Sequence, residues 1–263
     1  MALALRQVLA TARLAALGSL LESPVFLLDY GLRLLRVAVL LALWRVVLGA
    51  EGVASPVALG SVLTYALLAE VFADQLSVRT TIAEAFWQGS NAQHFLRPMA
   101  VVGQFASEML GGWIVNLALF SLPLLLAASL FGVDPRPASG ASALLFGMSL
   151  ALAICVGLAF DFIVAALTVA LEQPVWLMQW VSQAVGVVLS GAVIPLALLP
   201  WGLGDVLEWL PFASLAWAPL SIYTGIAEAP RLIALQIAWA CVLWPLAGWL
   251  WRANREKVVG FGG

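Results

Sequence analysis

Residues 79–98, RTTIAEAFWQGSNAQHFLRP, form the longest polar interval within the hydrophobic body of this 263-residue chain. Apolar runs of membrane-spanning length lie on both sides of the interval. It contains two arginines, the histidine His94, and an aromatic pair, Phe86 and Trp87. Because so polar a segment cannot lie in the hydrocarbon core of a bilayer, we interpret it as a water-exposed loop that carries a short amphipathic helix.

The overall composition indicates an integral membrane protein. Hydrophobic residues make up 63% of the chain, charged residues only 10%, and the mean hydropathy is +1.04. A soluble domain carries roughly a quarter charged residues. The apolar runs are continuous over about 20 residues instead of alternating in segments of about ten, which favours helices over a β-barrel. We therefore expect an all-α membrane protein in which residues 1–263 form a single transmembrane domain.

The apolar runs predict six transmembrane helices, at residues 25–48, 56–77, 99–131, 141–171, 175–199 and 232–251. The first is the least regular, because Arg33 and Arg36 lie in its first half and must reach towards the interface. Pro123 is expected to kink the third. Residues 1–22 have the cationic amphipathic pattern of a helix lying in the headgroup region. Residues 200–229 are too broken for a span, and we expect short re-entrant or interfacial helices there.

The distribution of cations predicts the orientation, because cytoplasmic loops carry the excess of lysine and arginine. With the N-terminus inside, the cytoplasmic side holds nine cations: Arg6, Arg13, Arg33, Arg36, Arg79, Arg97, Arg252, Arg255 and Lys257. The outer side holds three: Arg45, Arg136 and Arg231. Both termini and the loop 79–98 are therefore predicted to be cytoplasmic. Eleven arginines against one lysine suggest a GC-rich bacterial genome, so the expected location is the bacterial inner membrane.

The chain lacks the usual signatures of catalysis. No G-x-x-x-x-G-K-[ST] phosphate-binding motif occurs, and the only lysine is Lys257 in the tail. Neither G-x-S-x-G nor H-E-x-x-H occurs. One histidine and two cysteines inside apolar runs, Cys155 and Cys241, do not make a zinc site of ordinary ligand count. We expect a non-catalytic protein without metal or cofactor of its own, and transport follows largely by elimination.

Four acids lie inside or beside the predicted spans: Glu70, Asp74, Glu108 and Asp161. In this topology Glu70, Glu108 and Asp161 lie about ten residues from a cytoplasmic helix end, a common depth of about 15 Å. Carboxylates at that depth face protein or a wet cavity instead of lipid. They can form an acidic ring in an inward-opening cavity, suited to cationic or amphipathic cargo. Alternatively, they pair with Arg33 and Arg36 and hold the bundle together.

The fifth predicted span carries small residues at every fourth position: Ser182, Gly186 and Ser190. Such rows allow two membrane helices to approach closely. The row fits a contact within one chain and a contact between two chains equally well.

Two stretches resemble the ABC-2 type permeases, the membrane subunits of ATP-binding-cassette exporters. Residues 190–225, SGAVIPLALLPWGLGDVLEWLPFASLAWAPLSIYTG, are similar to that family's stretch after span 5, where I-P-L precedes a short helix and an L-P-F element. Residues 82–99, IAEAFWQGSNAQHFLRPM, are similar to the place of the family's coupling helix, which ends in L-x-R-P. The common Gly-Thr pair of that region is replaced here by Ala83, Glu84 and Ala85.

The resemblance implies that two permease chains, identical or related, work with two copies of an ATPase that binds ATP and magnesium. The ATPase would contact the N-terminal helix and the loop side chains Glu84, Phe86, Trp87, Gln88, His94 and Arg97. Spans 1 and 5 would form the permease seam, which suits the row Ser182, Gly186 and Ser190. The resemblance implies no nucleic-acid partner.

The implied function is outward movement of a small or amphipathic substrate, with a cationic one matching the acids. Two alternatives remain open. One is a stand-alone proton-coupled carrier with Glu70, Glu108 or Asp161 as the proton site, although an internal repeat typical of such carriers is not evident. The other is a membrane scaffold protein.

Overall fold

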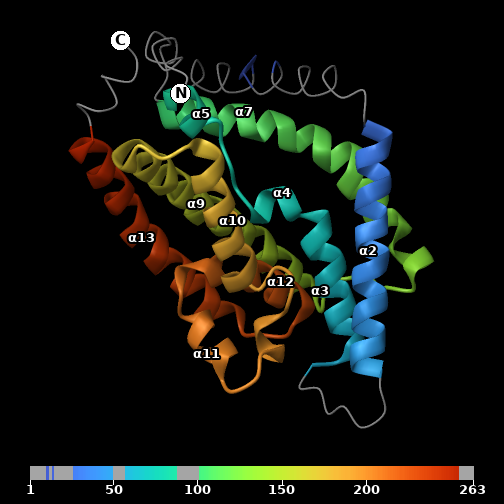
Figure 1. Ribbon diagram of the computed structural model, residues 1–263. Helices are drawn as coiled ribbons and strands as arrows, with labels where there is room; N and C mark the ends of the chain where they lie inside the picture. Colours follow the sequence, from blue (N-terminus) through green and yellow to red (C-terminus); the bar gives the residue numbers. More distant parts are fainter. Residues whose placement is uncertain (1–9, 12–13, 15–25, 50–56, 88–100, 255–263) are drawn as a thin grey trace.

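The computed structural model describes residues 10–11, 14, 26–49, 57–87 and 101–254, and all regular elements in these ranges are helical (Figure 1). This confirms the all-α prediction. Within them, three helices are long and apolar enough to cross a membrane: Gly103–Phe131, Gly140–Leu171 and Ala229–Ala253. Two shorter apolar helices accompany them, Leu59–Val71 and Val175–Leu189. The chain is thus a multi-pass membrane protein, while six crossings with cytoplasmic termini stay a prediction.

The first described helix, α2 (Phe26–Gly49), corresponds to the predicted span 25–48. Val37, Leu41 and Trp44, spaced three or four residues apart, are buried in a cluster with α3 (Leu59–Val71). The opposite face of α2 is exposed, as for Leu35 and Val46. This helix therefore packs on the bundle along one stripe only.

The predicted span 56–77 forms two helices instead of one. α3 ends at Phe72, whose φ of −105° and ψ of 18° leave the helical region, and α4 (Ala73–Leu76) adds one further turn. An extended segment then leads to α5 (Ile82–Trp87), the short helix expected in the polar loop. The apolar side chains of α5 pack against the end of α9 (Gly140–Leu171), so the polar loop begins inside the bundle.

The third predicted span, 99–131, is irregular near Pro123. It consists of α7 (Val101–Asn116), a π-helical turn η1 (Leu117–Ser121), α8 (Leu122–Leu126) and a 3-10 turn η2 (Ala127–Phe131). Because proline has no N–H and its ring crowds the preceding turn, the π turn directly before Pro123 absorbs the mismatch. The expected disturbance of this helix is present as a change of helix type.

α9 is the central helix, because it packs against elements from both the early and the late parts of the described chain. It begins after Ser139, whose side chain accepts a hydrogen bond from the Ser142 N–H at 3.0 Å. It ends at Glu172, a left-handed residue (φ 54°), and Pro174 then starts α10 (Val175–Leu189). Figure 1 shows α9 and α10 running side by side and in opposite directions, as the predicted tight turn requires.

The predicted span 175–199 was too long, because α10 ends at Leu189. Gly191 follows with a φ of 78°, and after Pro195 the chain makes only a short 3-10 turn, η3 (Leu196–Leu198). The apolar run continues to residue 199, but its last ten residues do not extend the helix, and Leu196 is buried in a cluster with Tyr65 of α3. Hydropathy alone does not distinguish these two courses.

Residues 200–229 contain short helices, as expected, but they differ in environment. α11 (Leu203–Glu208) exposes apolar side chains, including Val206, and is followed by η4 (Pro211–Ser214). In contrast, α12 (Trp217–Thr224) is buried from Trp217 to Ile222 and packs on α9 and α3. Interfacial character therefore suits α11, whereas α12 belongs to the core.

The turn before α9 is tied to α12 by the phenol of Tyr223, which donates to the Pro135 carbonyl at 2.6 Å. Burial and the nearby Asp134 carboxylate raise the pKa of Tyr223 above its ordinary value. The phenol therefore stays protonated at neutral pH and keeps its donor.

The last helix, α13 (Ala229–Ala253), contains the predicted span 232–251 and packs along α9. The fully buried side chain of Gln236 fixes this packing. Its amide nitrogen donates to the carbonyls of Ser149 and Ser214 at 3.0 and 2.9 Å, and its oxygen accepts from the Ser149 hydroxyl at 2.8 Å. Three elements are thus joined by one satisfied polar group.

Gly157 allows the extended segment before α5 to lie directly on α9. A Cβ at position 157 would stand 2.6 Å from Val78 Cγ2 and 2.8 Å from Val78 Cβ. Because the Cβ of Val78 cannot rotate away, Gly157→Ala must push the backbone of this segment outwards. We expect overpacking of about 1–3 kcal/mol, partly offset by about 1 kcal/mol of gained helix propensity.

The measurement is the apparent Tm of the purified protein in detergent. Gly147→Ala on the same helix is the matched control, because a Cβ there meets nothing within 4 Å. Gly157→Ala should melt lower than Gly147→Ala, and equal melting would show that the segment is not in tight contact with α9.

Candidate functional site

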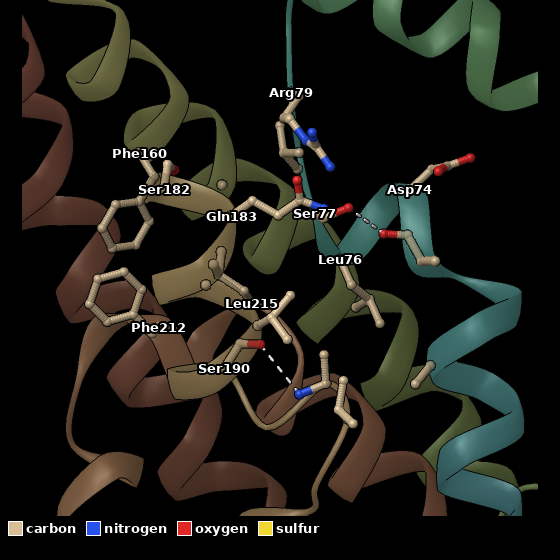
Figure 2. A pocket seen from close by; sticks show the side chains of 18 of the residues that line it. Asp74, Leu76, Ser77, Arg79, Phe160, Ser182, Gln183, Ser190, Phe212 and Leu215 are labelled. Carbon is tan, nitrogen blue, oxygen red and sulfur yellow. Dashed lines mark hydrogen bonds between the residues drawn. The ribbon is translucent and has the colours of Figure 1, made fainter. Parts of the chain in front are cut away.

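A cavity of about 440 Å³ opens between two halves of the bundle, in the size range of ligand pockets (Figure 2). One side is formed by α2, α3, α4 and the extended segment that follows them. The other side is formed by α9 and α10. Residues around Ser190 and η4 line the end of the cavity that lies away from Arg79. Helices from distant parts of the chain therefore meet around one space.

The lining changes in character along the cavity. Figure 2 shows Arg79 and Asp74 at one end, whereas Leu215 and Phe212 lie towards the other. The Phe212 ring stacks on Phe160, with ring centroids 4.9 Å apart and planes 17° apart. The cavity thus combines a charged and polar end with an apolar end, as an amphipathic molecule requires.

Two of the acids that line the cavity form ion pairs with α2. Arg36 Nε lies 3.0 Å from Glu70 Oε1, and Arg33 Nη2 lies 3.8 Å from Asp74 Oδ2. Glu70 is nearly buried, so its arginine offsets the cost of holding a carboxylate there. These contacts correspond to the second of the two interpretations considered for the acids, the one in which they hold the bundle together.

Asp161 also lines the cavity, but it is held by hydrogen bonds instead of an arginine. Its Oδ2 accepts from the backbone N–H of Thr80 at 3.0 Å and from the Thr80 hydroxyl at 2.5 Å. The carboxylate of α9 thereby fixes the extended segment immediately before α5.

Glu84, on α5, makes the corresponding contact with α10. Its Oε1 accepts a hydrogen bond from Gln179 Nε2, while its Oε2 is buried without a partner. Gln179 lines the cavity. The stretch from Thr80 to Glu84 is therefore joined to both helices of one cavity wall, α9 through Asp161 and α10 through Gln179.

The remaining predicted site residues are placed as follows. Glu108 lies on α7 and is not among the residues that line the cavity. The row Ser182, Gly186 and Ser190 faces the cavity of its own chain, and a contact with a second chain stays a prediction. The backbone of α5 includes Phe86 and Trp87, but their side chains, together with Gln88, His94 and Arg97, lie outside the described residues.

The sequence analysis did not identify several residues that line the cavity. Gln179 and Gln183 lie four residues apart on α10 and face the same side as Ser182 and Gly186. Two amide side chains on the small-residue face of an apolar helix indicate a polar cavity lining, but the sequence analysis considered only the acids. Thr80, and the stacking of Phe160 on Phe212, had no comparable signal, because they depend on contacts between distant segments.

In the ranges that the structure describes, no three His, Cys, Asp or Glu side chains gather closely enough to hold an ion.

A family model described as ABC-2 family transporter protein matches residues 34–262, which is nearly the whole described bundle and its cavity. A comparison with curated proteins finds no match. The extent of the match, together with the multi-pass helical fold, shows the family. The chain belongs to the ABC-2 family of transporter membrane proteins.

Proposed function

We propose that the chain is the permease subunit of an ATP-binding-cassette exporter, which moves a small or amphipathic substrate outwards while a separate ATPase supplies the energy. The observation that carries the proposal is the cavity, whose charged end includes Arg79, just before α5, and whose apolar end includes Phe212 and Leu215. The protein itself is not catalytic in this proposal. ATP and magnesium are bound by the ATPase.

The two ends of the bundle support the proposed direction of transport. In Figure 1 α5, the start of α2 and the end of α13 lie at one end of the molecule, and α11 lies at the other. Cations predicted to be cytoplasmic, such as Arg79 and Arg252, lie on elements at the α5 end. If that end faces the cytoplasm of a bacterium, the cavity opens inwards and is ready to load cargo for export.

The cavity supports an amphipathic cargo better than a cationic one. Glu70 and Asp74 are paired with arginines, and Asp161 Oδ2 accepts two hydrogen bonds from Thr80. Arg79 at the same end adds a positive charge. The acids are therefore poorly placed to select a positive charge, whereas the polar-to-apolar gradient remains.

Two kinds of partner complete the proposal. Two ATPase copies would bind at the α5 end through the loop that contains residues 79–98. A second permease chain would lie against α2 and α10, which both border the cavity and expose apolar side chains such as Leu32 and Val188. The cavity would then be closed between two chains within the lipid bilayer.

Co-purification tests this proposal. The tagged chain should retain a P-loop ATPase encoded by a neighbouring gene, and proteoliposomes should move a fluorescent amphiphile only when that ATPase and ATP are present. Transport by the purified chain alone, driven by a proton gradient, would overturn the proposal in favour of a carrier. An ATPase that never binds would favour a scaffold.

One prediction of the proposed function concerns the aromatic pair of α5. Replacing Phe86 and Trp87 together by alanine should remove apolar contact area at the surface offered to the ATPase, since aromatic side chains dominate such interfaces. We expect ATP hydrolysis to become independent of the amphiphile, and transport per ATP to fall several-fold. Both are measured in proteoliposomes.

Replacement of Trp201 by alanine provides the control, because this side chain is exposed in the region of α11, at the opposite end of the molecule. It should leave coupling intact. Unchanged coupling in the Phe86 and Trp87 variant would count against α5 as the contact.

Another prediction of the proposed function concerns access to the cavity. A Cβ at Gly186 meets no atom within 4 Å, so Gly186→Phe should project its ring into open space without overpacking the chain. Transport should drop strongly, while folding and ATPase binding persist. The amount transported per ATP is compared with that of Gly147→Phe.

Gly147 is the matched control, because it is exposed on α9 and does not line the cavity. If Gly186→Phe transports normally, the cavity is not on the substrate path. If it instead separates two permease chains in size-exclusion chromatography, the row belongs to the seam between chains.

A further inference from the structure

α10 is the loosely packed wall of the cavity. None of the residues from Val175 to Leu189 is buried, although the neighbouring α9 and α12 contain many buried positions. One face of α10 borders the cavity and the other is exposed, as for Trp180 and Val188. Within the single chain, little apolar packing therefore opposes a movement of this helix relative to α9.

The two ends of α10 are turns with left-handed residues, Glu172 before it and Gly191 after it. The second end is firmly held. The Ser190 carbonyl accepts from the Trp217 N–H at 2.9 Å, and the Gly191 carbonyl accepts from the Tyr65 hydroxyl at 2.7 Å. This junction is held in position by its backbone carbonyls, and Gly191 has no side chain to restrict its backbone. It is therefore suited to act as a hinge.

The body of α10 is held by a single described side-chain hydrogen bond, from Gln179 to Glu84 on α5. Within the described ranges, no other side-chain hydrogen bond or ion pair joins residues 175–189 to another element. Gln179 is about 12 residues from Gly191, which makes a lever of about 18 Å along the helix. A force transmitted to Gln179 therefore acts far from the hinge.

The Glu84 side of this contact is firm against α9. Ile82, Ala83 and Ala85 of α5 are buried in a cluster with α9, and Thr80 is bound to Asp161. However, Glu84 Oε2 is buried without a hydrogen bond. An unsatisfied carboxylate oxygen regains solvation when the contact opens, so the closed and open arrangements are closer in free energy than in a fully satisfied pair.

We propose that α10 swings about Ser190 and Gly191 as the moving wall of the cavity, and that Gln179 is a positioning residue through which Glu84 of α5 sets the angle of this wall. The proposal rests on the proposed function only for the source of the movement, the ATPase at α5. The swing displaces Gln179 and Gln183 more than Gly186. It therefore opens and closes the charged end of the cavity while the apolar end changes little.

The experiment measures the wall directly by pulsed electron paramagnetic resonance in nanodiscs. Spin labels are attached to Val181→Cys on α10 and Leu246→Cys on α13, two exposed positions, after Cys155 and Cys241 are replaced by alanine. In the isolated chain we expect one narrow distance distribution. Glu84→Ala and Gln179→Ala should each broaden it, because the wall loses its contact.

The matched control is the exchange of partners, Glu84→Gln together with Gln179→Glu. It keeps the size of both side chains and lets the new amide donate to the new carboxylate, so the narrow distribution should return. In the complex with the ATPase, non-hydrolysable ATP should shift the distance in the unsubstituted pair and in the exchanged pair. Transport per ATP should fall in the two alanine variants and recover in the exchange.

Equal distributions in the unsubstituted pair and both alanine variants would overturn the proposal, as would an exchange that behaves like the single alanine variants. These outcomes differ from failure of the proposed function. If no ATPase binds, the isolated chain still reports whether the contact positions α10. If ATP is hydrolysed and cargo moves while the distance to α10 stays constant, the permease proposal stands and the moving wall does not.

Discussion

The hydrogen bonds between Asp161 and Thr80 are the contact on which the arrangement of the site depends. They fix an extended segment on α9 at a level where Gly157 leaves room for it. The segment then delivers α5 to the end of α9, where its apolar side chains are buried. Without this attachment, the polar loop would have no defined position relative to the cavity. A carboxylate inside an apolar helix is costly, and its full use of a neighbouring hydroxyl and N–H explains how it is tolerated.

The sequence predicted the long helices well, because a continuous apolar run with a clear start leaves few alternatives. The predicted span 141–171 is α9, and the predicted span 25–48 is α2 with its charges. The errors occur where apolar residues are covered by protein instead of lipid. α12 has the composition of an interfacial segment but lies in the core, and the run after Leu189 turns at Gly191. Hydropathy records that a segment avoids water, and it does not record which surface covers it.

The sequence predicted how deep the acids lie in the membrane, but not which of them face the cavity. Equal distances from the membrane face placed Glu70, Glu108 and Asp161 at one level, yet Glu108 is on α7, away from the cavity. Depth follows from a residue count, whereas the direction of a side chain depends on how the helices pack. The ion pairs of Glu70 and Asp74 could be foreseen, because arginines in a first span need partners. The amides of α10 could have been foreseen as well, since they share a face with the small residues.

The same sequence builds a tightly packed region and one loosely packed helix from different residue choices. Around α9 and α13, small residues allow close packing, and both ends of the buried Gln236 amide are hydrogen-bonded. α10 instead places tryptophan and valine outwards and small or amide side chains towards the cavity, so it gains little from its own bundle. A transporter has to change the shape of its cavity without unfolding. Confining weak packing to one helix, fixed at Gly191 and joined to α5 by a single hydrogen bond among the described side chains, meets both requirements.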